Sequence, residues 1–202
     1  TYLEGGHTGA EGESTDEVAS GTDADEVVNP HLWLNAAYAA KYAERIAEAL
    51  AAADPSHAAD YETGLAAYAK VLADLGAWDL DPRGSAAVPE ANRTVVSFHD
   101  AFPYFAEAYG LTIDGTVVDA PGQDPSAGDV SALIRAIKDK GIKAVFAEAQ
   151  FNEDLVRTIA DESGAVVGSD LYTDSVGDAP ADTYAGMMEW NIEQVASALS
   201  GT

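Results

Sequence analysis

Large apolar side chains recur at helical spacing between residues 34 and 75. The first stripe is Leu34, Tyr38, Tyr42, Ile46 and Leu50, and the second is Tyr61, Leu65, Tyr68, Leu72 and Leu75. Steps of three and four residues predict an amphipathic helix for each stripe. Between them, Asp54 is placed to cap the second helix and Pro55 to occupy its first turn. A helix over residues 55–78 is roughly 35 Å long at 1.5 Å per residue, enough to cross a small domain.

The pattern changes after residue 93 to short apolar runs that alternate with amphipathic stretches. Strands are predicted at 94–98, 112–118, 143–147 and 165–168, and helices at 101–109, 126–140, 153–163 and 182–199. Ser126 and Asp129 form a capping-box-like start, and Gly141 stands at the end of the same helix. Alternation of strand and helix predicts the α/β fold class, with a parallel sheet flanked by helices on both faces.

Two segments lack a regular apolar pattern. Residues 1–30 hold eight acidic residues, five glycines and no Lys or Arg, and we expect residues 1–28 to form a mobile acidic loop. Residues 79–92 begin Asp-Leu-Asp-Pro-Arg-Gly, and this richness in turn formers predicts a linker. The opening Thr1-Tyr2-Leu3-Glu4 does not look like a natural start, so we expect that an upstream part has been removed.

The charge of the chain is strongly negative. Ten Lys and Arg against 35 Asp and Glu give a net charge of −25, which disfavours nucleic acid and anionic lipid as partners because both require a basic surface. Since 47% of the residues are hydrophobic, we expect a folded domain with an acidic surface. Life in high salt explains the bulk of such a charge, and the alternative is that carboxylates bind a cation.

Other function classes are excluded by absent residues or motifs. The chain has no cysteine, which rules out disulfides, thiolate zinc sites and cysteine nucleophiles. No apolar run approaches the roughly 20 residues of a membrane span, and no signal peptide opens the chain. Neither a Gly-x-Ser-x-Gly elbow nor a phosphate-binding Gly-rich loop with Lys is present.

Polar side chains stand where ligands collect in a parallel sheet. His99 directly follows the first predicted strand, Glu148 follows the third, and Asp174 lies in the loop after the fourth. His31 lies just before the first helix, beside Trp33, which is large enough to shield one side of the imidazole. Neutral imidazoles with a carboxylate suit a borderline divalent ion such as zinc or manganese.

Structural roles compete with this interpretation. A histidine at a strand end is often a hydrogen-bonded structural residue, Asp174 is also a turn former, and Glu148 is placed to cap the following helix or to meet a basic side chain. His7 and His57 are expected to be solvated.

Several segments together resemble the ABC-transporter solute-binding proteins for zinc, manganese and iron. Asn29-Pro30-His31-Leu32-Trp33-Leu34 resembles the Asp-Pro-His-x-Trp-Leu segment of that family, and residues 96–105 resemble its strand-to-helix segment that carries the next ligand. Residues 147–151, 173–175 and 184–191 also match. The order and spacing agree from about residue 29 to the C-terminus, and the acidic loop has a family counterpart that is usually richer in histidine.

The resemblance implies a ligand set and a domain organisation. It makes His31, His99 and Asp174 metal ligands, to which family members add one histidine from an N-terminal lobe. Because the match begins midway through the family pattern, that lobe is expected to be missing. Residues 29–54 then end the N-terminal lobe, residues 55–78 form a rigid connector helix between lobes, and residues 93–202 form the C-terminal lobe.

The resemblance also implies a function. The whole protein is expected to be a monomeric, extracytoplasmic binding component, anchored at the membrane, that captures a divalent metal ion and delivers it to an ABC permease without catalysing a reaction. Histidine at position 99 is associated in the family with zinc, and glutamate with manganese, so zinc is expected and manganese is the alternative. Two other functions stay open: a metal-dependent hydrolase with Glu148 as base, and a surface adhesion module in which the metal is structural.

Overall fold

The computed structural model describes residues 28–77, 88–118, 125–148 and 153–200. Residues 1–27 of the predicted acidic loop, with His7, therefore lie outside the described residues. The same holds for residues 79–87 of the predicted linker. Among the described helices, none combines the length and apolar character that a bilayer-spanning segment needs.

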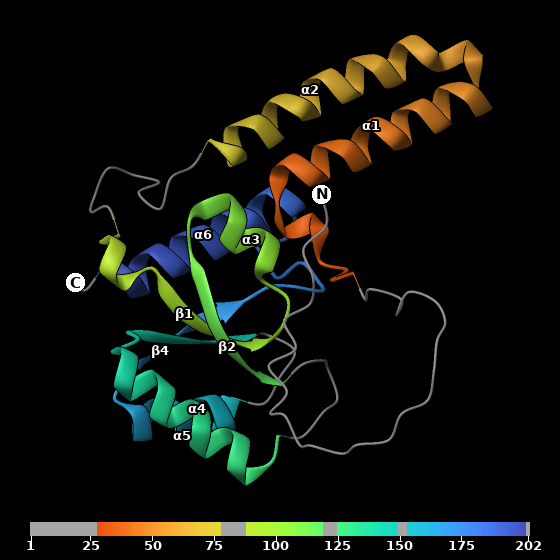
Figure 1. Cartoon of the computed structure of the whole chain (residues 1–202). Coiled ribbons are helices and arrows are strands. Elements are labelled where there is room, and N and C mark those ends of the chain that lie inside the picture. Colours follow the sequence, from red (N-terminus) through yellow and green to blue (C-terminus); the bar gives the residue numbers. More distant parts are fainter. Residues whose placement is uncertain (1–27, 78–87, 119–124, 149–152, 201–202) are drawn as a thin grey trace, which may run out of the picture.

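The first two helices form an antiparallel hairpin that extends away from the rest of the molecule (Figure 1). Helix α1 covers Ala36–Ala53 and helix α2 covers Ala58–Gly76. The Asn35 side chain caps α1 by accepting the Ala37 N–H at 2.9 Å. A 3₁₀ turn at Pro55–His57 joins the helices, so α2 begins three residues later than the sequence predicted. Asp54 lies at the start of this turn, where its carboxylate accepts the Ser56 hydroxyl at 2.6 Å.

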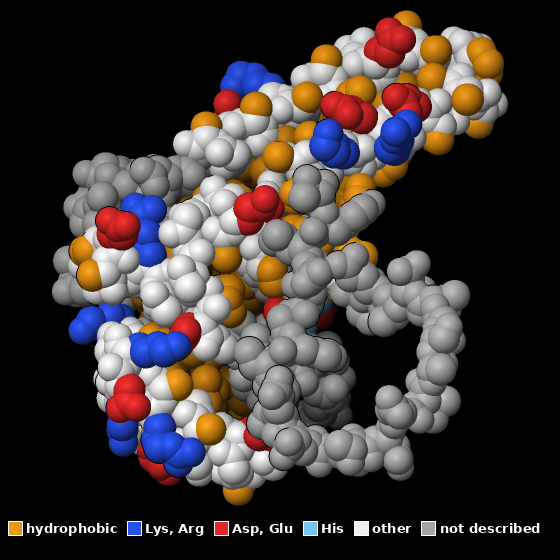
Figure 2. Space-filling view, in the orientation of Figure 1, with side chains coloured by type: hydrophobic (Ala, Val, Ile, Leu, Met, Phe, Trp, Pro, Cys, Tyr) orange, Lys and Arg blue, Asp and Glu red, His pale blue; other side chains and the backbone are white. Residues whose placement is uncertain are grey.

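Only part of each apolar stripe is covered in this hairpin. Leu34, Leu72 and Leu75 are buried where the hairpin meets the α/β unit. Farther out, Tyr42, Ile46 and Leu50 are 43%, 59% and 43% exposed, and apolar side chains are visible along the hairpin in Figure 2. Beyond the α/β unit each helix has only its neighbour to pack against, so the outer part of the first stripe faces solvent.

The remaining strands form the predicted parallel sheet. They are β1 (Thr94–His99), β2 (Thr112–Val118), β3 (Ala144–Glu148) and β4 (Val166–Leu171), all parallel and in the order β2-β1-β3-β4. The α/β fold class is thereby confirmed. Strand β4 runs three residues beyond the predicted end at residue 168, because its pairing with β3 continues to Glu148 opposite Leu171.

Helices cover both faces of the sheet. Figure 1 shows α4 (Ala127–Lys140) and α5 (Glu153–Ser163) on one face, and α3 (Pro103–Tyr109) and α6 (Tyr184–Ser200) on the other. Alternate strand residues divide between two cores: Val96 packs in the cluster formed with α4 and α5, and Val95 in the cluster formed with α3 and α6. The predicted capping box is present, with the Ser126 hydroxyl accepting from the Asp129 N–H.

The order of the strands places the topological switch point of the sheet between β1 and β3. From β1 the chain proceeds to β2 on one side, and from β3 it proceeds to β4 on the other. Ligands of open α/β sheets bind at such a switch point, beyond the carboxyl ends of the strands. His99 is the last residue of β1 and Glu148 is the last residue of β3, so both lie at that point.

Candidate metal centre

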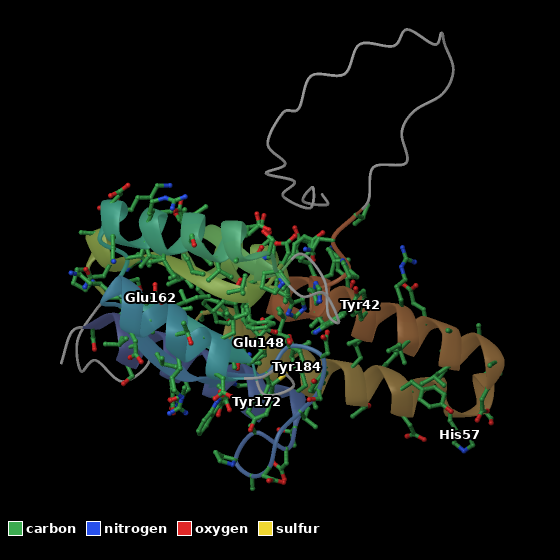
Figure 3. The ribbon with its side chains drawn as sticks, turned by 90° about the horizontal axis from the view of Figure 1, so that it is seen from below. Tyr42, His57, Glu148, Glu162, Tyr172 and Tyr184 are labelled. Atoms are coloured by element: carbon green, nitrogen blue, oxygen red, sulfur yellow. The ribbon has the colours of Figure 1, made fainter. Side chains whose placement is uncertain are left out.

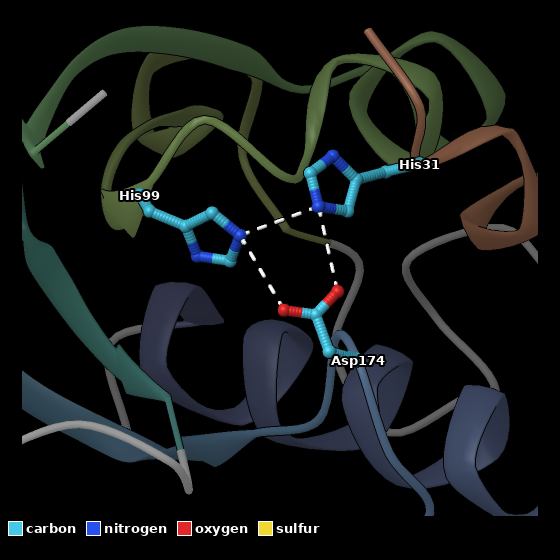
Figure 4. A group of neighbouring side chains, drawn as sticks. All are labelled: His31, His99 and Asp174. Atoms are coloured by element: carbon cyan, nitrogen blue, oxygen red, sulfur yellow. Dashed lines mark hydrogen bonds and ion pairs between the residues drawn. The ribbon is translucent and has the colours of Figure 1, made fainter. Parts of the chain in front are cut away.

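The structure brings together the three side chains that the sequence and the resemblance singled out (Figure 4). His31 precedes the 3₁₀ turn Leu32–Leu34, His99 ends β1, and Asp174 lies in the loop between β4 and α6. The two Nε2 atoms of the histidines are 3.3 Å apart. The Asp174 carboxylate lies 3.5 Å from His31 Nε2 through Oδ1 and 3.8 Å from His99 Nε2 through Oδ2.

The three groups lie close enough together to share one coordination shell. Zinc binds nitrogen and oxygen ligands at about 2.0–2.2 Å, which places neighbouring ligands of a tetrahedron about 3.4 Å apart. At a similar bond length, neighbouring ligands of an octahedron are about 3.0 Å apart. The two Nε2 atoms, 3.3 Å apart, have a spacing close to the tetrahedral value, whereas the two distances to Asp174 run to different oxygens, and one ligand atom from each residue gives separations within 4.8 Å. The three groups therefore have the geometry to share one small cation.

The environment of His31 favours its neutral, ligating form. His99 is fully buried, His31 is 8% exposed, and the Asp174 side chain is 40% exposed. Burial and the adjacent His99 imidazole lower the pKa of His31 from its ordinary value of 6.5, outweighing the nearby carboxylates, which raise it. His31 is accordingly neutral at pH 7, the form in which Nε2 can bind a metal ion.

Asn29 orients the His31 ring. The Asn29 Oδ1 atom accepts the His31 backbone N–H at 3.1 Å and lies 2.9 Å from His31 Nδ1. Because the amide nitrogen of Asn29 donates to the Asp100 carbonyl at 2.7 Å and to its carboxylate at 3.1 Å, the amide oxygen must face the imidazole. Nδ1 then carries the hydrogen, and the Nε2 lone pair points into the site.

Glu148 lies behind His99, on the side away from the other ligands. Its carboxylate is fully buried, accepts the His99 backbone N–H at 2.9 Å and the Thr173 hydroxyl at 2.7 Å, and lies 2.6 Å from His99 Nδ1. Of the two roles predicted for Glu148, contact with a basic group is therefore the one observed, and the basic group is an imidazole. Figure 3 shows Glu148 within the α/β unit, between its helices and the hairpin.

Trp33 lies edge-on to the His31 ring, as the sequence predicted for a shielding neighbour. The ring centroids are 5.2 Å apart at an interplanar angle of 61°. The Trp33 indole N–H donates to the Thr173 carbonyl at 2.8 Å, and the Trp33 carbonyl accepts the Tyr184 hydroxyl at 2.8 Å. The first bond joins the His31 segment to the loop that carries Asp174, and the second joins it to the start of α6.

His57 does not belong to the site. It lies at the far end of the hairpin (Figure 3), with its side chain 60% exposed and its Nδ1 atom 2.7 Å from Asp54. The positioning contacts of Asn29 and Thr173 had not been foreseen. Each of these residues stands one or two positions before a candidate ligand, within a segment that carries the family resemblance.

Comparison with known proteins identifies the family of metal-binding solute-binding proteins to which the fold belongs. The model of the family "Zinc-uptake complex component A periplasmic" matches residues 3–198, so the chain belongs to this family. The manganese-binding lipoprotein MntA of Halalkalibacterium halodurans is 33% identical over 175 residues, which cover 86% of this chain and 58% of MntA. The chain thus spans little more than half the length of this relative.

Solved structures of similar proteins share the fold. The periplasmic zinc-binding protein TroA from Treponema pallidum superposes with a TM-score of 0.77 at 28% identity, covering 88% of this chain and 66% of TroA. FpvC from Pseudomonas aeruginosa, solved in complex with Mn²⁺, gives a TM-score of 0.74 at 33% identity, covering 87% and 65%. The predicted resemblance is confirmed, and the family consists of substrate-binding transport proteins, not enzymes.

Proposed function

We propose that this chain is the larger part of the substrate-binding component of an ABC importer, and that it binds a divalent transition-metal ion through His31, His99 and Asp174. The observation that carries the proposal is the convergence of one ligand atom from each of the three residues within 4.8 Å. The names of the relatives support it, because they are metal-binding lipoproteins or substrate-binding lipoproteins of metal ABC transporters.

The burial of the three groups suggests an order of capture. The Asp174 carboxylate is the exposed ligand, and both imidazoles lie deeper. In our proposal the hydrated ion meets Asp174 first and exchanges water for imidazole nitrogen as it moves inward. We further propose that residues 29–54 end an N-terminal lobe, that residues 55–78 connect the lobes, and that residues 93–202 form the C-terminal lobe.

Within this proposal we favour zinc as the ion, with manganese as the alternative. Two imidazole nitrogens with one carboxylate suit zinc, and the Irving–Williams order places zinc above manganese on such ligands. Similar proteins do not decide the matter, since MntA is named for manganese and TroA for zinc. A competition titration addresses it directly: zinc should displace manganese from the chain, and a site that retains manganese against equimolar zinc would contradict the choice of zinc.

Neither alternative function has a specific observation in its favour. The hydrolase hypothesis needs Glu148 as a general base facing the metal, but its Oε1 atom accepts the His99 backbone N–H and its Oε2 atom accepts the Thr173 hydroxyl. The adhesion module and the high-salt habitat stay predictions. For the whole protein we propose an extracytoplasmic, lipid-anchored monomer that delivers the ion to a permease, which accords with the lipoprotein names of the relatives.

The test is a zinc titration at high salt on this chain, on three ligand variants and on one control variant. His31→Ala, His99→Ala and Asp174→Asn should each weaken zinc binding by more than about 100-fold, because loss of a mere partner behind a ligand already costs about 10–100-fold. His57→Ala removes a histidine outside the site and serves as the matched control, with unchanged affinity expected. Zinc binding that survives His99→Ala at wild-type strength would remove the basis of the proposal.

A further inference from the structure

Glu148 joins two of the three ligand-bearing segments. Its Oε1 atom accepts the backbone N–H of His99, at the end of β1, and its Oε2 atom accepts the hydroxyl of Thr173, which immediately precedes Asp174. The same Oε2 atom lies 2.6 Å from His99 Nδ1. A fully buried carboxylate is costly unless several donors surround it, and here the donors come from the segments that hold two ligands.

We propose that Glu148 is a positioning residue that selects the tautomer of His99 and fastens it, through Thr173, to the loop of Asp174. The proposal rests on the proposed metal site. With the hydrogen on Nδ1 facing Glu148, His99 presents a bare Nε2 toward His31 and Asp174. The contact with Thr173 fixes the neighbouring carboxylate relative to that nitrogen. His99 Nε2 and the Asp174 carboxylate are thus held 3.8 Å apart, in place to bind the same ion before it arrives.

The chemistry of the carboxylate explains why an amide cannot replace it. Both carboxylate oxygens can accept hydrogen bonds: the His99 backbone N–H and the Thr173 hydroxyl donate to them, while Oε2 also faces His99 Nδ1 at 2.6 Å as an ion-pair contact. Glutamine supplies one accepting oxygen and one donating NH₂ group. If the amide oxygen of the glutamine faces the His99 ring, the NH₂ group cannot accept, and one of the other donors loses its partner. If the NH₂ group faces the ring, it donates to an Nδ1 atom that carries no hydrogen. The second arrangement moves the His99 hydrogen to Nε2, which blocks the nitrogen that has to bind the ion.

The experiment combines zinc affinity with the ¹⁵N NMR spectrum of the metal-free His99 ring. In the wild type we expect the signature of an Nδ1-protonated imidazole. Glu148→Gln should shift this signature toward the Nε2-protonated form and weaken zinc binding by about 10–100-fold. Asp114→Asn is the control, because it neutralises a carboxylate of the same sheet whose partner is Lys140, and it should leave both readouts unchanged.

Variants at Thr173 distinguish a positioning role of Glu148 from simple structural support. Thr173→Val removes the hydroxyl at nearly constant shape, so it should keep the His99 tautomer and weaken zinc binding several-fold by loosening the Asp174 loop. Thr173→Ser retains the hydroxyl and should restore wild-type affinity. This pair also keeps the proposal testable if Glu148→Gln does not fold.

The outcomes distinguish this proposal from the metal site on which it rests. If His99→Ala abolishes zinc binding while Glu148→Gln keeps both the wild-type tautomer and an affinity within twofold, the positioning role of Glu148 is wrong and the site stands. Wild-type affinity in Thr173→Val would refute the coupling to the Asp174 loop. If His99→Ala itself binds zinc normally, the metal site is wrong.

Discussion

Asn29 is a neutral residue held between an imidazole and a carboxylate. Its amide group accepts from His31 and donates to Asp100, so both of its ends are used. The segment that it resembles in the family carries aspartate at this position. An aspartate here would place two carboxylates about where the 3.1 Å hydrogen bond to Asp100 now lies, and like charges at that distance repel. Asn29 and Asp100 are therefore matched to one another.

A double-mutant cycle tests this match. Asn29→Asp should lower the free energy of unfolding of the metal-free protein by about 1–3 kcal/mol, since it loses donors to a part-buried site and adds a like charge. In the double variant Asn29→Asp with Asp100→Asn, the new amide at position 100 can donate to the new carboxylate. We expect a favourable coupling of about 0.5–3 kcal/mol in urea denaturation of the four proteins. Additive effects would show that the two side chains act independently.

The lowered pKa of His31 makes the stability of the metal-free protein depend on pH. In the unfolded chain this histidine takes up a proton near its ordinary pKa of about 6.5, whereas burial lowers the pKa in the folded protein. Between the two values the unfolded state binds more protons, so stability is lost as the pH falls through about 6.5, until the folded pKa is passed. Urea denaturation with chelator present, from pH 8 to pH 5, should show this fall.

The matched variant for that measurement is His31→Asn, which cannot titrate. Its free energy of unfolding should change less between pH 7.5 and pH 6 than that of the wild type. Equal slopes for the two proteins would mean that His31 titrates alike in the folded and unfolded states.

At the level of single residues, chain position and resemblance together pointed to His31, His99 and Asp174, whose side chains lie close together in the structure. The supporting residues were harder to foresee because their roles depend on which strands are neighbours. Glu148 reaches His99 only because β3 pairs with β1, although 49 residues separate them. No local pattern around residue 148 carries that information.

Among the elements, helix and strand types were predicted correctly wherever the apolar period was strong. β2 and α5 have the predicted bounds, whereas β4 was predicted too short because its apolar run ends at Gly168. Strand β4 lies at the edge of the sheet, where polar side chains can face solvent while the backbone continues to pair. The period of the hairpin helices likewise predicted their existence but not which apolar residues would remain exposed.

Two helical glycines should respond in opposite ways to the same substitution. Gly64 is exposed in α2, and a Cβ atom added there meets nothing within 4 Å. Gly64→Ala should therefore raise the free energy of unfolding by about 0.5–1 kcal/mol through helix propensity. At Gly186 in α6 the added Cβ atom would overlap the Pro180 carbonyl oxygen, so Gly186→Ala should cost about 1–3 kcal/mol. Thermal denaturation of both variants measures the signs, and a stabilised Gly186→Ala protein would contradict the close approach.

For the whole molecule, the excess of acidic residues dominates the long-range electrostatics. A net charge of −25 on a 21.0 kDa chain produces self-repulsion that opposes the compact state. Salt weakens this repulsion because the Debye length falls from about 10 Å at 0.1 M to about 3 Å at 1 M. The hydrophobic cores on the two faces of the sheet are not weakened by this change, so the folded state should gain stability as salt is added.

The gain in stability should be steepest at low salt. This dependence distinguishes the screening of charge repulsion from stabilisation by a solute that is excluded from the protein surface. Screening acts mostly below about 0.5 M, where the Debye length changes most, whereas an excluded solute stabilises in proportion to its concentration. We expect the Tm of the metal-free protein to rise sharply with NaCl up to about 0.5 M and more slowly above it. Sucrose at matched osmolality is the control and should give only a shallow, linear rise. A Tm that does not change below 0.5 M NaCl would contradict this expectation. It would mean that repulsion between the acidic residues is already small in dilute buffer, so that the net charge does not affect the stability of the fold.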